Sequence, residues 1–106
     1  MFIIETSKEY DWPITVNNPV DGKFTETKFT VRFKKLTQTE LTQMFSDVGD
    51  ATDDSIARKI IVGWDESSVG AEFTDENLNS MLDSVGYATA IVHAYVESVK
   101  GILRKN

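Results

Sequence analysis

The sequence contains no cysteine and only one histidine among its 106 residues. The absence of cysteine excludes disulfides and thiolate metal sites, and it fits a reducing cytoplasm. The single histidine, His93, has no cysteine to activate, and a catalytic or metal site requires several groups that converge. We therefore interpret His93 as a surface or half-buried residue of a helix.

Long apolar runs and basic clusters are also missing. The longest apolar runs, such as residues 60–62, are far too short to span a bilayer. The first five residues lack the basic region and long apolar stretch of a signal peptide. The net charge is −6, and the basic residues gather only at 32–35 and weakly at 104–105, so few can contact phosphates. The sequence predicts a soluble cytoplasmic protein that binds neither membranes nor nucleic acid.

The motifs of common enzymes and ion sites are absent as well. The six glycines form neither GxGxxG nor a P-loop, and no serine lies in a GxSxG setting. Asp47, Asp50, Asp53 and Asp54 form an acidic group, but it lacks the spacing, central glycine and closing glutamate of an EF-hand. Helix N-terminal charge explains this group without an ion. We therefore expect no catalytic, cofactor-binding or metal-binding residue.

Residues 11–35 carry the pattern of a β-hairpin. Trp12, Ile14 and Val16 alternate with polar residues or proline, and a second alternating run ends at Phe33. Between the two runs, residues 18–22 end in Asp-Gly, which tolerates the positive φ angles of a tight turn. Pro13 cannot donate a hydrogen bond to a neighbouring strand, so the first strand is expected at a sheet edge. Residues 1–5 are a candidate for a third short strand.

The period changes to that of helices after Leu36, and residues 37–103 predict about four of them. Thr37 and Glu40 match a capping box at the first helix, which Gly49 and Asp50 are expected to end. Thr52 is placed to cap the second helix. Two further helices are expected, one starting at Thr74 and one over residues 87–103, where apolar residues keep a helical spacing.

A polar loop follows Gly63-Trp64. The side chain of Trp64 has two interpretations. Trp64 continues the apolar spacing of Ile56, Ile60 and Ile61, which predicts a core residue at the end of the second helix. The alternative is a partly exposed binding residue, because tryptophan is enriched at interface hot spots. Its spacing favours the core. Phe73 precedes the cap of the next helix, and its spacing to Leu78 is that of a hydrophobic staple.

A strand pair followed by helices predicts an α+β fold, with an N-terminal β-hairpin followed by a compact bundle of about four α-helices. The length indicates one domain over residues 1–106, with the hairpin at about 11–35 and the helical part at about 37–103. A lone hairpin is marginal in water, so its apolar face must pack on the helices or on another subunit. Open strand edges also favour association with another chain.

Several ordered landmarks are shared with a known family. They are the Trp-Pro at the start of the hairpin, the Phe33-to-Leu36 step into the first helix, Gly63-Trp64, the segment from Phe73 to Leu78, and the final Lys-Asn. From Tyr10 onward the sequence resembles the small tail assembly chaperones of long-tailed bacteriophages and prophages. The order and spacing of the landmarks, rather than any one of them, carry the resemblance.

The resemblance implies a non-enzymatic assembly chaperone. Such proteins bind the tape-measure protein, keep its apolar helical stretches soluble and help to recruit tail tube subunits. They act in the cytoplasm of the bacterial host and are absent from the mature virion. A longer form made by ribosomal frameshifting often accompanies the short one, and this chain would be the short form.

Protein-binding residues are expected on the apolar face of the hairpin and, second, on the last helix. The candidates are Trp12, Phe29, Val31, Phe33, Tyr95 and Val99. The alternative for all six is the intramolecular core. Repeated weak contacts favour a homo-oligomer, because a ring or filament of copies gains avidity for an unassembled client.

Two other functions remain open from the sequence. One is a structural component of the virion, either a tail or a head–tail connector protein, although tube proteins usually contain more strand than this chain predicts. The other is a small enzyme or regulator whose site carries no recognisable motif.

Overall fold

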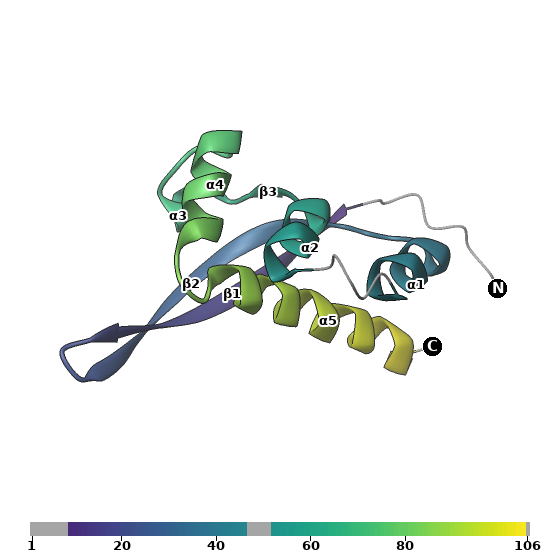
Figure 1. The fold of residues 1–106 in the computed structure, drawn as a ribbon, viewed down its shortest axis with the longest axis horizontal. Helices are drawn as coiled ribbons and strands as arrows, with labels where there is room; N and C mark the ends of the chain where they lie inside the picture. The colour runs from purple at the N-terminus through teal and green to yellow at the C-terminus, as the bar shows by residue number, and fades with distance from the viewer. Residues whose placement is uncertain (1–8, 47–51, 106) are drawn as a thin grey trace.

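The computed structural model describes residues 9–46 and 52–105, and it has the expected α+β architecture, with a hairpin followed by helices (Figure 1). The elements are β1 (Glu9–Val20), β2 (Lys23–Lys34), α1 (Gln38–Ser46), α2 (Asp53–Ile60), β3 (Ile61–Trp64), α3 (Glu66–Val69), α4 (Asp75–Asp83) and α5 (Tyr87–Lys105). The predicted short strand at 1–5 and the predicted helix end at Gly49 and Asp50 lie outside the described residues.

The hairpin spans nearly the predicted residues, but it turns on two residues rather than over 18–22. Val20 pairs with Lys23, and the residues between them, Asp21 and Gly22, have φ angles of 49° and 78°. Positive φ at both central positions is the geometry of a type I′ turn, whose twist matches that of the two strands. An aspartate followed by glycine adopts this geometry at little cost, so the sequence fixes the register of the whole hairpin locally.

The outer edge of β1 carries both prolines of the sequence in the same orientation. In β2, the Thr30 N–H donates to Ser68 Oγ (3.1 Å), and the Thr30 carbonyl accepts from the Asp65 N–H (2.9 Å). Thr30 therefore bonds away from β1, so its partner Pro13 directs its backbone nitrogen outward. The period of two places Pro19 in the same way. Two donors are thus missing from this edge, which opposes the addition of another strand.

Trp64 was predicted to end the second helix, and this assignment of secondary structure was wrong. Helix α2 ends at Ile60, and Ile61–Trp64 forms β3, which pairs antiparallel with β2 so that Trp64 lies opposite Val31. The sheet order is β1-β2-β3. The predicted burial of Ile60, Ile61 and Trp64 was confirmed. Adjacent β-branched residues fit a strand, and the pairing with β2 provides the backbone partners that decide between the two structures.

The helix starts follow the predicted capping residues. Thr37 and Glu40 bond reciprocally, with the Glu40 N–H donating to Thr37 Oγ1 (3.2 Å) and the Thr37 N–H donating to Glu40 Oε1 (3.0 Å). Thr52 caps α2 through the Ser55 N–H (3.1 Å), and Thr74 caps α4 in the same way. These bonds satisfy backbone donors that have no partner inside the helix.

Replacing Thr52 with alanine is expected to lower the free energy of unfolding by about 1 kcal/mol, because the first turn of α2 loses its cap. The measurement is the midpoint of urea unfolding, monitored by circular dichroism. Thr42→Ala is the matched control, since Thr42 lies inside α1 and its hydroxyl bonds to Gln38 alone, donating to the carbonyl and accepting from the side-chain amide. Equal losses in the two variants would contradict a specific capping role.

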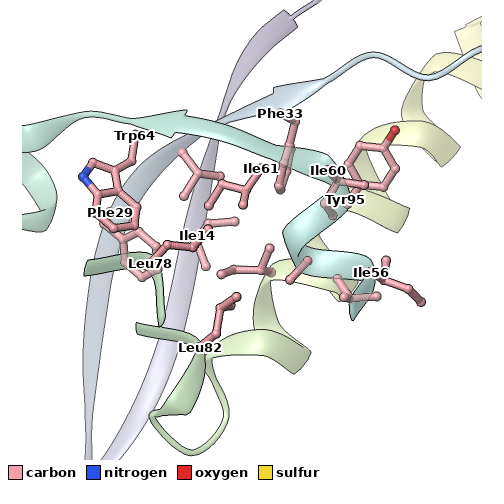
Figure 2. Packing of buried hydrophobic residues seen from close by; sticks show 14 of the residues in the cluster. Ile14, Phe29, Phe33, Ile56, Ile60, Ile61, Trp64, Leu78, Leu82 and Tyr95 are labelled. Carbon is pink, nitrogen blue, oxygen red and sulfur yellow. The ribbon is translucent and has the colours of Figure 1, made fainter. Parts of the chain in front are cut away.

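One face of the sheet is covered and the other is polar. Helix α5 packs against β1, α2 and α4, and it runs beside the hairpin in Figure 1. On the uncovered face, Arg32 forms ion pairs with Glu9 (2.8 Å) and Asp11 (3.0 Å) of the neighbouring strand. Figure 2 shows the buried cluster between the sheet and the helices, which includes Ile14, Phe29, Phe33, Ile56, Ile60, Ile61, Trp64, Leu78, Leu82 and Tyr95.

Candidate protein-binding surface

The six predicted protein-binding residues divide into two groups. Phe29, Val31, Phe33 and Tyr95 are 4%, 0%, 0% and 1% exposed, so the chain's own helices and strands cover them. Trp12 and Val99 are only partly buried and pack at the margin of the core. Binding of a partner by these six residues stays a prediction, and within the folded chain only the two marginal ones present side-chain surface.

An aromatic series connects the margin of the sheet to α5. Tyr10 lies edge-on to Trp12 and to Phe33, with ring centroids 6.4 Å and 5.9 Å apart. Phe33 in turn lies edge-on to Tyr95 at 5.1 Å. Such arrangements bring the positive edge of one ring to the negative face of the next. The series holds β1, β2 and α5 in a fixed relation and sets the position of Trp12.

The two tyrosine hydroxyls are held by specific partners. Tyr95 donates to the Lys34 carbonyl (3.1 Å), and Ser98 Oγ donates to the Tyr95 carbonyl (2.7 Å). Because the only hydroxyl proton of Ser98 is used in that bond, the Tyr10 hydroxyl donates to Ser98 Oγ (2.7 Å). Burial, with a smaller contribution from the nearby Tyr10, raises the pKa of Tyr95 to about 12. Burial also raises the pKa of Tyr10.

The raised pKa of Tyr95 predicts a loss of stability at alkaline pH. Unfolded tyrosine ionises near its ordinary pKa of 10.0, whereas folded Tyr95 keeps its proton until about pH 12. Its contribution to folding is complete below pH 10 and is lost as the pH rises toward 12. The free energy of unfolding should therefore fall in this window by up to about 1.4 kcal/mol per pH unit for this one proton.

The measurement is a series of urea titrations between pH 8 and pH 12. Tyr95→Phe is the control, because it keeps the buried ring and removes the titrating hydroxyl. The fall should be shallower in the variant, and identical slopes in the two proteins would show that other groups cause the alkaline loss.

An apolar hollow opens beside Val99, between the start of α1 and the end of α5. Its volume is about 130 Å³, and its walls are mainly apolar side chains. The lining residues are Tyr10, Lys35, Leu36, Gln38, Leu41, Tyr95 and Val99. The sequence analysis identified Tyr95 and Val99 but not the contribution of Tyr10, Leu36 and Leu41, because these come together only when α1 folds back beside α5.

The hairpin extends past the helices (Figure 1), and its end carries exposed apolar side chains. We call residues 17–26 the hairpin arm. Its Phe24 is 76% exposed and Val20 is 50% exposed. At the base of the arm, the Asn18 amide donates to Thr27 Oγ1 (2.7 Å), and Phe29 stacks on Tyr87 with centroids 6.0 Å apart. The sequence analysis missed Phe24 because it lies out of phase with the apolar face of β2.

Trp64 is a core residue, as its spacing favoured. Its side chain is 9% exposed, and the indole N–H donates to the Ala71 carbonyl (2.8 Å). Phe73 lies edge-on to it, with centroids 4.9 Å apart. Trp64 therefore closes the loop between β3 and α4, including the short helix α3, onto the end of the sheet.

The part of the chain that the structure describes lacks the groups of side chains that hold metal ions. Within residues 9–46 and 52–105, no three His, Asp or Glu side chains are grouped so that they could hold a metal ion. His93 is exposed on α5, and Asp47 and Asp50 of the acidic group lie outside the described residues. Over the same residues, none of the helices combines the length and the apolar character needed to cross a bilayer.

Comparison with known proteins gives a family match over nearly the whole chain. A family model described as phage tail assembly chaperone matches residues 2–106. The chain belongs to this family. Searches of curated proteins and of solved structures found no match. The tail assembly chaperone thus acts in the assembly of phage tails, as the sequence resemblance indicated. The arm, the hollow and the margin at Trp12 are among the apolar features that its described residues expose.

Proposed function

We propose that this tail assembly chaperone binds the tape-measure protein without catalysis and helps to recruit tail tube subunits around it. It works in the cytoplasm of the bacterial host and leaves before the virion is complete. Membership of the tail assembly chaperone family, matched over residues 2–106, is the observation that carries the proposal.

The surface of the molecule supports this role. The chain has a net charge of −6, and the uncovered face of its sheet is polar, which keeps the free chaperone soluble. Apolar contact surface is confined to small regions such as the hairpin arm and the margin at Trp12. A contact made by few apolar side chains is weak and reversible. A chaperone needs such contacts, because it must later release its client.

Several copies acting together compensate for weak single contacts. A homo-oligomer presents the same small surface repeatedly along one client chain, and the second and later contacts form at a high effective concentration. A longer, frameshifted form of the chain within the same oligomer would connect the client to the tail tube protein. Within the predicted set we expect Trp12 to contact the client, because it is only partly buried at the margin of the core.

The proposal predicts that coexpression with the tape-measure protein of the same phage makes that partner soluble and lets it copurify. Trp12→Ala should reduce the copurified amount several-fold while leaving the fold intact. His93→Ala is the control, because His93 is exposed on α5 and lies beside Thr15 and Asn17 rather than in the aromatic series around Trp12. An insoluble client in the presence of wild-type chaperone, together with chaperone found in purified virions, would instead favour a structural tail or head–tail connector component.

A further inference from the structure

We propose that the chaperone assembles head to tail, with Phe24 at the tip of one copy's hairpin arm inserted into the apolar hollow beside Val99 of the next copy. This inference rests on the homo-oligomer of the proposed function and names its interface. The arm is the knob, the hollow is the hole, and both belong to the same chain.

The arm has the properties of a preformed knob. Phe24 is the most exposed aromatic residue described, at 76%, and Pro19 lies directly opposite it in the hairpin. Regular pairing continues to the last pair, Val20 with Lys23, and the type I′ turn follows at once. Because the strands already fix the arm, insertion of Phe24 orders few additional degrees of freedom.

The hollow matches an aromatic ring in size and chemistry. Its volume is about 130 Å³, and its walls are formed largely by Leu36, Leu41, Val99 and two tyrosines. An apolar cavity of about 150 Å³ lined by similar side chains is known to accept benzene. One phenyl group therefore fits, whereas a helix or strand of a partner does not.

The positions of knob and hole require a second molecule. The chain is elongated, with extents of 52 × 34 × 27 Å. In Figure 1 the tip of the hairpin lies at one end of the long axis, and α1 with the end of α5, which border the hollow, lies at the other. A chain therefore cannot fill its own hollow with its own arm, but the next copy along the axis can.

The proposed interface also fits the protected edge of β1. Pro13 and Pro19 remove outward donors from that edge, so pairing of backbones between copies is disfavoured. Side-chain insertion at the ends of the molecule avoids the edge altogether. Contacts between two different surfaces of identical copies are heterologous, and they extend into rings or open filaments rather than stopping at a dimer.

The first test uses the purified chaperone alone, in size-exclusion chromatography with light scattering. Wild type should form species larger than a dimer that dissociate on dilution, and Phe24→Asp should raise the apparent dissociation constant by about thirty-fold or more. Val85→Asp is the matched control, because Val85 is 96% exposed at the turn between α4 and α5 and is not among the residues that line the hollow. It should assemble like wild type.

The second test blocks the hole. Val99→Glu should abolish assembly as Phe24→Asp does, and Leu41→Glu on the opposite wall serves if Val99→Glu alters the circular dichroism spectrum. His93→Glu, which adds the same charge on the exposed side of α5, should leave assembly unchanged. Mixing the Phe24→Asp and Val99→Glu proteins should then give a dimer, because each pair retains one intact knob and one intact hole.

Three results would overturn the proposal: a wild-type protein that stays monomeric at about 100 µM, a Phe24→Asp variant that assembles normally, or a mixture of the two blocked variants that forms no dimer. Loss of tape-measure binding by Phe24→Asp without any change in assembly would overturn it too, because the arm would then bind the client. Normal assembly with an insoluble client would contradict the proposed function instead and leave the interface standing.

Discussion

Replacing Phe33 with alanine is expected to lower the free energy of unfolding by about 3–5 kcal/mol. The side chain is fully buried and lies edge-on to Tyr10 on β1 and to Tyr95 on α5, so its removal leaves a cavity where the two strands meet the helix. A domain of ordinary stability has only about 5–15 kcal/mol in total. The variant should therefore be marginally folded, with a greatly reduced urea midpoint and melting temperature.

Phe24→Ala is the matched control for this prediction. It removes the same atoms from the same strand, but Phe24 is 76% exposed, so the change should stay within about 0.5 kcal/mol of wild type. Both proteins should be measured at a concentration where the chain is monomeric, because the proposed assembly through Phe24 would add stability of its own. Similar losses in the two variants would show that β2 is not the centre of the core.

Trp64→Ala is expected to cost a similar amount, about 3–5 kcal/mol, and to open the segment between β3 and α4. The indole fills the space beside Phe73, and its N–H satisfies the Ala71 carbonyl. Without it, the loop over residues 65–72 loses its anchor to the sheet. We expect faster cleavage of this segment by a protease under native conditions, alongside the lower urea midpoint.

Trp64→Phe separates packing from hydrogen bonding at this position. Phenylalanine retains an aromatic contact with Phe73 but leaves the Ala71 carbonyl without its donor, so the loss should be smaller, about 1–3 kcal/mol. Trp12→Ala provides the comparison at a partly exposed tryptophan and should cost less than Trp64→Ala. If Trp12 proved the costlier of the two, the assignment of Trp64 to the core would be wrong.

The features that the sequence predicted well depend on neighbouring residues. The Asp-Gly turn fixes the hairpin register, and Thr37, Thr52 and Thr74 bond to residues three positions away, so local sequence determines each of them. The edge position expected for Pro13 was also confirmed. A proline lacks its N–H in any fold, so this prediction needs no information about distant residues.

The features that the sequence did not predict depend on distant partners. Ile60, Ile61 and Trp64 have a spacing that suits a buried helix, and only the pairing with β2, about thirty residues earlier, makes Ile61–Trp64 a strand. Sequence spacing likewise shows that Phe33 and Tyr95 are apolar-face residues, but not that they face each other. The hollow beside Val99 could not be predicted, because it is bounded by two helices far apart in the chain.

The outward-facing prolines of β1 bear on the resistance of the chaperone to aggregation. A flat strand edge with all of its donors free is a template for cross-β stacking, which is close to irreversible. The donors missing at Pro13 and Pro19 disfavour such a stack along the outer edge of β1. Contacts made by side chains remain available and are reversible, so the placement of two prolines disfavours irreversible stacking without blocking reversible association.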